Sequence, residues 1–177
     1  FFYKSKVIPH FFVKNKNFTK PKNKIKKKYK FSYFGSFYGP RKPDPLIEAI
    51  SLANINNYNF SKKCIFQFYG SDHLGFYDNS SLKKFDIPKN VVFKKRVNYS
   101  KSLQLMKKSD YLISIDAKNI ENVYLPSKLI EYLQFKKPII VIANFKSPSH
   151  ELSKKFDITF ADINNINQIS NKIIEIT

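Results

Sequence analysis

The chain has 177 residues, 42% of them hydrophobic, which is enough for one domain with a substantial core and excludes a disordered tail. Its single cysteine, Cys64, excludes an internal disulfide and fits a reducing compartment. No apolar run could span a bilayer, no signal-peptide pattern is found, and no Cys/His cluster has metal-ligand spacing. We therefore expect a cytoplasmic protein without a bound metal.

The positive charge is concentrated near the start of the chain. Residues 1–30 contain 11 lysines and no acidic residue, whereas the rest of the chain contributes +8 to the total net charge of +19. We interpret 1–30 as a basic arm and interdomain linker, and 31–177 as the folded domain. The chain has 30 lysines and two arginines, a bias typical of A/T-rich coding sequences, and specific nucleic-acid readers favour arginine. We therefore expect no specific nucleic-acid partner.

Strands and helices alternate along residues 31–177. Apolar runs predict six strands, at 31–34, 64–69, 91–93, 111–115, 139–142 and 158–160. Helical spacing predicts helices at 45–55, 100–108, 126–137, 149–156 and 163–176, with a helical turn at 82–85. Asp44 and Ser100 are the predicted caps of the first two helices. The fold class is therefore α/β: a Rossmann-like, doubly wound, mostly parallel sheet of about six strands with helices on both faces.

Residues 125–142 combine a helix start with a buried strand. Pro126 suits a first helical turn, and Ser127 lies beside the free N–H groups of that turn. A helix that begins at the edge of a parallel sheet is well suited to bind an anion. This predicts a phosphate-bearing ligand near Ser127, with Glu131 one turn further on.

A second candidate lies in the loop that follows the first strand. Gly35 and Gly39 permit backbone conformations that other residues resist, and Arg41 and Lys42 supply positive charge. Neither a G-x-G-x-x-G fingerprint nor a P-loop is present, which disfavours ordinary Rossmann dehydrogenases and P-loop ATPases. Arg96, the other arginine, follows the third strand.

Several segments together resemble the C-terminal, nucleotide-sugar-binding domain of the GT-B glycosyltransferases, specifically retaining family 4. The sequence P-S-K-L-I-E-Y-L at 126–133, followed by K-P-I-I at 137–140, is similar to the donor-site helix and strand of that family. The segment 35–50 resembles its first loop and helix, and 107–114 falls in order between them. The resemblance covers 31–177 and implies that this domain is the C-terminal half of a GT-B fold.

The resemblance implies a nucleotide diphosphate sugar as ligand, with no other cofactor. Arg41 matches the diphosphate-binding lysine of the family, whereas the basic residue expected after the first glycine is Ser36 here. The amides near Ser127 and Lys128 would meet the diphosphate, and Glu131 matches the glutamate that holds the ribose. The loop around 95–97 would lie near the base.

The predicted donor-binding residues are Gly35, Ser36, Arg41, Lys42, Arg96, Val97, Pro126, Ser127, Lys128 and Glu131. Many family members have a further glutamate that contacts the sugar, but the matching residue here is Val123, so that role and the catalytic residues stay unassigned. The implied reaction is hexosyl transfer, with retention, to a hydroxyl of a glycan or lipid-linked acceptor, as in polysaccharide biosynthesis. The acceptor site would belong to a missing N-terminal domain, so we expect this chain alone to be inactive.

Two other functions remain open. A GT-B sugar-nucleotide epimerase would share the fold and the donor, although its carboxylate-rich centre is not evident. A basic module that binds nucleic acid or an anionic membrane surface is supported by the lysine-rich arm. The same arm could hold the transferase peripherally at the inner face of the membrane.

Overall fold

The computed structural model describes residues 28–70, 86–118 and 124–177. Most of the predicted arm, the predicted helical turn at 82–85 and Val123 lie outside these residues. The strands are β1 (Tyr29–Phe34), β2 (Cys64–Tyr69), β3 (Val91–Lys94), β4 (Tyr111–Ile115), β5 (Ile139–Ala143) and β6 (Thr159–Asp162). The helices are α1 (Asp44–Asn56), α2 (Phe60–Lys63), α4 (Tyr99–Lys108), α5 (Ser127–Leu133), α6 (Pro148–Lys155) and α7 (Ile166–Glu175).

The six strands form one sheet in the order β3-β2-β1-β4-β5-β6. Every strand pair is parallel. The chain first winds outward from β1 to β3 and then crosses back to β4, which lies on the other side of β1. This confirms the predicted α/β, doubly wound sheet and places its topological switch point between β1 and β4.

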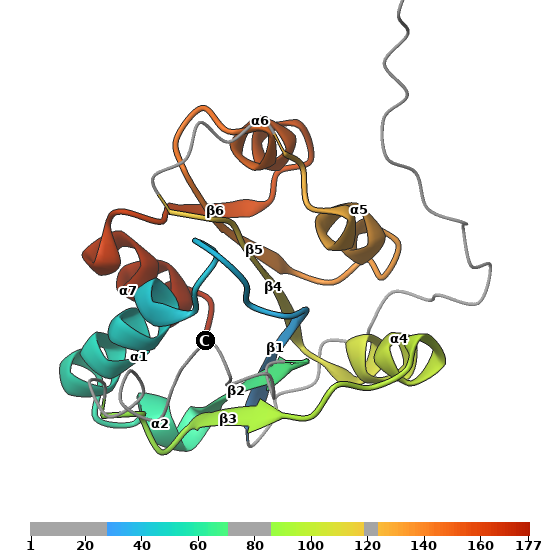
Figure 1. Cartoon of the computed structure of the whole chain (residues 1–177). Coiled ribbons are helices and arrows are strands. Elements are labelled where there is room, and N and C mark those ends of the chain that lie inside the picture. Colours follow the sequence, from blue (N-terminus) through green and yellow to red (C-terminus); the bar gives the residue numbers. More distant parts are fainter. Residues whose placement is uncertain (1–27, 71–85, 119–123) are drawn as a thin grey trace, which may run out of the picture.

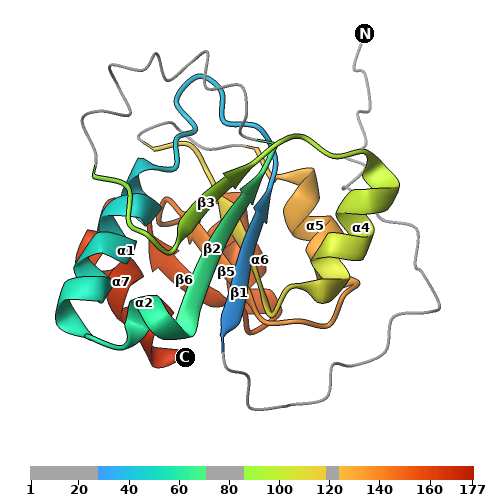
Figure 2. The same ribbon diagram turned by 90° about the horizontal axis from the view of Figure 1, so that it is seen from below.

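Helices cover both faces of the sheet (Figures 1 and 2). On one face, α1, α2 and α7 bury apolar side chains against the sheet, and α1 also packs along α7. On the other face, α4, α5 and α6 pack against a second cluster. β5 contributes to both clusters because all five of its residues are buried, as its unbroken apolar sequence predicted.

Aromatic side chains from neighbouring strands stack in a row across the centre of the sheet. The strand register sets Phe31 of β1 beside Phe66 of β2 and Tyr111 of β4. The ring centroids lie 4.6 Å from Phe31 to Phe66 and 4.4 Å from Phe31 to Tyr111. In-register pairs of this kind stabilise a sheet through side-chain contact, so the row fixes the three central strands relative to one another.

The five predicted helices begin one to three residues from their predicted starts, and both predicted caps differ from those in the structure. Asp44 is the first residue of α1 rather than its cap, and the N-cap position is Pro43. α4 is capped by Asn98, whose side chain accepts a hydrogen bond from the Lys101 N–H, and not by Ser100. Both helices begin one residue earlier than predicted. The extended backbone of Asn98 suits a cap, whereas Pro43 is itself in a helical conformation, with φ −79° and ψ −9°, and its carbonyl accepts the Ile47 N–H at 3.0 Å.

The thiol of Cys64 is buried at the start of β2. It has no accessible surface, and burial raises its pKa from 9.0 to about 11. Because the thiolate is the reactive form, we expect Ellman's reagent at pH 8 to label the folded chain at least about a hundredfold more slowly than the chain unfolded in guanidinium. Labelling at similar rates would contradict this placement of Cys64. The burial of the neutral thiol should stabilise the fold below pH 9 and lose that effect as the pH rises through about 11.

Candidate functional site

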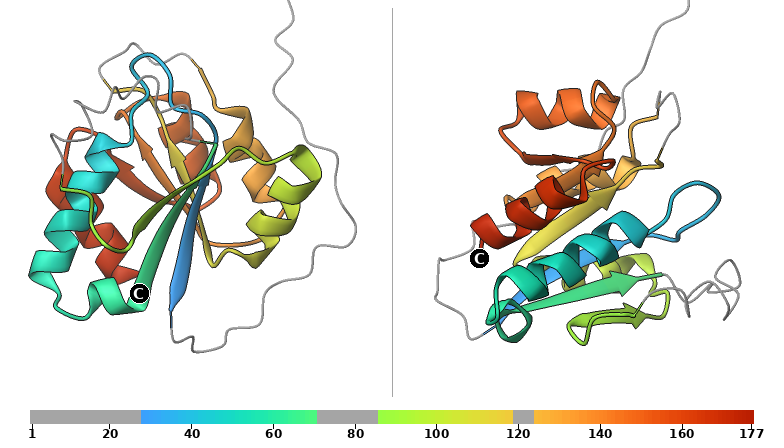
Figure 3. Two further views of the ribbon diagram at one scale, coloured as in Figure 1. Left: turned by 60° about the horizontal axis from the view of Figure 1, so that its bottom comes forward. Right: turned by 90° about the vertical axis from the view of Figure 1, so that its left-hand side faces the viewer.

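A pocket of about 580 Å³ opens at the carboxyl ends of β1 and β4, at the switch point of the sheet. Three segments line it: the end of β1 with its following loop, the end of β4, and the residues that lead into α5. The loop after β1 stands out beyond the arrowheads of the strands (Figure 3, right). The volume of the pocket falls within the roughly 300–1,000 Å³ typical of small-molecule sites.

One wall of the pocket holds Arg41. A turn is closed by a hydrogen bond of 3.1 Å from the Arg41 N–H to the Tyr38 carbonyl, and Gly39 in this turn has a φ of 54°, which favours glycine. The turn brings the guanidinium 5.2 Å from the centre of the Tyr38 ring, and its Nη1 donates to the Tyr38 hydroxyl at 3.3 Å. Its Nε has no hydrogen-bond partner among the described residues. The cation is therefore fixed in place, with donor capacity remaining.

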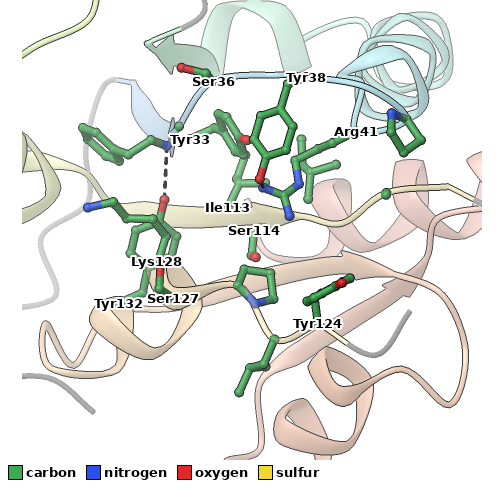
Figure 4. A pocket seen from close by; sticks show the side chains of 17 residues that line it. Tyr33, Ser36, Tyr38, Arg41, Ile113, Ser114, Tyr124, Ser127, Lys128 and Tyr132 are labelled. Atoms are coloured by element: carbon green, nitrogen blue, oxygen red, sulfur yellow. Dashed lines mark hydrogen bonds between the residues drawn. The ribbon is translucent and has the colours of Figure 1, made fainter. Parts of the chain in front are cut away.

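The floor of the pocket carries two buried tyrosines. Burial raises the pKa of the Tyr33 hydroxyl to about 12, against an opposing effect of the nearby Arg41, so this group stays protonated at neutral pH. Tyr132 of α5 is fully buried, which raises the pKa of its hydroxyl as well. The Tyr132 oxygen accepts a hydrogen bond of 3.1 Å from the Phe34 N–H (dashed in Figure 4). This bond connects α5 directly to the end of β1.

The opposite wall is the start of α5. Pro126 occupies the N-cap position and provides no side-chain cap. Its carbonyl accepts the Leu129 N–H at 3.0 Å, which leaves the N–H groups of Ser127 and Lys128 without a cap from that residue. Ser127 and Lys128 follow and line the pocket. The Lys128 ammonium lies 2.5 Å from a carboxylate oxygen of Glu131, which is one turn along the helix.

The pocket brings together six of the ten predicted donor-binding residues. Those that line it are Gly35, Ser36, Arg41, Pro126, Ser127 and Lys128. Four do not line it. Lys42 lines a separate cavity of about 180 Å³, and Glu131 pairs with Lys128. Arg96 and Val97 follow β3, which is two strands away from β1. The proposed contacts of all ten remain predictions.

Sequence reasoning missed the aromatic lining of the pocket. Tyr33, Tyr38, Tyr124 and Tyr132 all contribute to it. Tyr38 could have been found, because it lies between two glycines in the loop at the carboxyl end of the first strand, where ligands of such sheets bind. Tyr124 and Tyr132 gave no such signal in a chain with 11 tyrosines.

The arrangement suits a ligand with an anionic group and an apolar or ring-shaped body. Arg41 and the free donors of the first turn of α5 can bind phosphate oxygens, and the tyrosines offer flat surfaces with polar tips. Within the described residues, no three His, Cys, Asp or Glu side chains are grouped so as to hold a metal ion. Nor does any described helix have the length and apolar composition needed to cross a membrane.

No protein-family model and no curated protein matches this sequence. Comparison with solved structures supports the predicted fold class: the fold is similar to the Rossmann-like α/β domain of GT-B glycosyltransferases. A point mutant of S. aureus TarM, crystallised with fondaparinux, α-GlcNAc-glycerol and UDP, superposes with a TM-score of 0.67 at 16% identity over 93% of this chain.

Two further similar structures come from trehalose metabolism. The UDP-forming α,α-trehalose-phosphate synthase from Burkholderia vietnamiensis gives a TM-score of 0.63 at 6% identity over 84% of this chain. The N-terminal domain of Candida albicans trehalose-6-phosphate phosphatase gives 0.64 at 12% identity over 85%. The chain spans about a third of the length of each of these chains: 31% for TarM, 36% for the synthase and 34% for the phosphatase domain.

Proposed function

We propose that this domain binds a nucleotide diphosphate sugar in the pocket between β1 and β4, as the donor-binding part of a retaining glycosyltransferase. The observation that carries the proposal is the pocket itself, with Arg41 on one wall and the start of α5 on the other. Ligands of doubly wound sheets bind beyond the carboxyl ends of the strands at the switch point. The likeness to GT-B structures supports glycosyl transfer as the proposed reaction class.

The same geometry suggests how the leaving group is stabilised. As the sugar departs, negative charge grows on the diphosphate, and fixed donors that face it lower the barrier. Arg41 is fixed by the ring and hydroxyl of Tyr38, so little reorganisation accompanies the reaction. The sugar would be passed to a hydroxyl of a glycan or lipid-linked acceptor held by a further domain.

Arg41→Ala should weaken nucleotide diphosphate binding about 10- to 100-fold, because hydrogen bonds to a charged group contribute about 1.5–3 kcal/mol. A thermal-shift screen with UDP, GDP and ADP identifies the base, since a ligand of the folded state raises its stability. Calorimetric titration of the selected nucleotide then gives the affinities. UDP is the first choice because the TarM structure contains it.

Lys62→Ala is the matched control for the loss of one positive charge. Lys62 lies on α2 above the Tyr58 ring, outside the residues that line the pocket. The Lys62→Ala variant should bind the nucleotide with an affinity within about twofold of that of the original chain. The proposal fails if no nucleoside diphosphate stabilises the fold, or if Arg41→Ala binds as tightly as Lys62→Ala.

A further inference from the structure

Lys128 lines the pocket, but its ammonium is engaged by two neighbouring side chains. The first is Glu131, at 2.5 Å. The second is Tyr99, at the start of α4, whose ring centre lies 5.4 Å from the Lys128 Nζ. Hydrogen bonding to the Glu131 carboxylate raises the pKa of the Tyr99 hydroxyl, which agrees with this placement of Tyr99 beside the ion pair. The three side chains form a cluster that joins α4 to α5.

This ion pair differs from the others at the same helix spacing. The Glu131 side chain is 12% exposed, whereas Glu175, which pairs with Lys172 at 2.8 Å, is 58% exposed. The lysines of the two pairs are equally exposed, at 38%. Less water around the carboxylate means less screening, so Glu131 holds and neutralises Lys128 more strongly than Glu175 does Lys172.

The direction of the Lys128 side chain agrees with a strong pairing to Glu131. In Figure 4, Lys128 points away from Arg41 and away from the middle of the pocket. The two cations on the pocket walls are therefore not equivalent. Arg41 faces the space where an anion would sit, and Lys128 is turned toward its own carboxylate.

We propose that Glu131 and Tyr99 are positioning residues that hold back and neutralise Lys128, so that Arg41 is the side-chain cation that meets the diphosphate. This inference rests on the proposed function and gives Glu131 a role besides the predicted ribose contact. Release of Lys128 from Glu131 should strengthen the binding of an anion, because a neutralised cation becomes available to it.

Inorganic pyrophosphate is the probe that separates the two roles of Glu131, because it has the diphosphate but no ribose. We expect Glu131→Gln to increase pyrophosphate affinity about twofold to fivefold, on the scale of a partly exposed ion pair. Tyr99→Phe, which keeps the ring but loses the hydroxyl, should give a smaller gain. The gain should vanish in Glu131→Gln/Lys128→Ala, and Lys128→Ala alone should change affinity less than about twofold.

Glu175→Gln is the matched control, since it removes the same charge at the same helix spacing on α7 and should leave the affinity unchanged. Pyrophosphate is measured by competition with the nucleoside diphosphate selected in the thermal-shift screen. The inference is overturned if Glu131→Gln binds pyrophosphate no better than the original chain, or if Lys128→Ala weakens it as much as Arg41→Ala. If neither pyrophosphate nor any nucleoside diphosphate binds any variant, the proposed function fails together with it.

Discussion

Phe31→Ala is expected to lower the free energy of unfolding by about 3–5 kcal/mol, the usual effect of deleting a large aromatic side chain from a core. Phe31 has no accessible surface and lies between the rings of Phe66 and Tyr111. The substitution therefore leaves a cavity and also removes two stacked contacts, each worth about 0.5–1.5 kcal/mol beyond the buried area. The midpoint of thermal unfolding should fall by roughly 6–20 °C for a chain of this length.

Phe156→Ala is the matched control for that measurement, because Phe156 follows α6 and is 49% exposed. Its effect should stay within about 0.5 kcal/mol, as for most surface substitutions. Urea denaturation followed by circular dichroism gives both values on one scale. A similar loss of stability in the two variants would show that the aromatic row across the central strands is not where the fold derives its stability.

The sheet could be predicted because its strands are short, mostly apolar runs. Ile139–Ala143 is buried on both faces, and in Cys64–Tyr69 every second residue is buried. Element ends were less predictable because they depend on single backbone conformations. α2 was not predicted at all, since four residues are too few for a periodic pattern. The parallel pairing followed from the alternation of elements, which requires crossover connections.

The site was predicted in part, because some of its residues adjoin strands and helices that the sequence predicts. Gly35, Arg41 and Ser127 could be located because they follow or precede recognisable elements at the carboxyl edge of the sheet. Lys128 and Glu131 are three residues apart on a helix, and this spacing alone indicates an ordinary surface pair. The Lys128–Glu131 pair is unusual because Glu131 is largely buried beside Tyr99, which lies 32 positions earlier in the chain. Such contacts depend on how α4 and α5 pack, which the sequence does not reveal locally.

Tyr132→Ala should also lower the free energy of unfolding by about 3–5 kcal/mol, and Tyr132→Phe isolates the part that belongs to the hydroxyl, about 1–3 kcal/mol. The pairing of β1 with β4 ends at Tyr33 and Ile113, so the next N–H on that side, that of Phe34, extends beyond the ladder. The Tyr132 hydroxyl is its acceptor, in a buried setting. Without the oxygen, a buried donor is left unsatisfied.

The same variant should affect the pocket, because Phe34 immediately precedes Gly35 and the loop that carries Arg41. We expect Tyr132→Phe to bind the selected nucleoside diphosphate several-fold more weakly and to exchange the Phe34 amide hydrogen faster, as measured by NMR. Tyr58→Phe, which removes a hydroxyl from a tyrosine 81% exposed, should change neither property. If the Phe34 amide keeps its protection in Tyr132→Phe, the hydroxyl does not hold the end of β1. The path from α5 to the Arg41 loop must then run through side-chain packing alone.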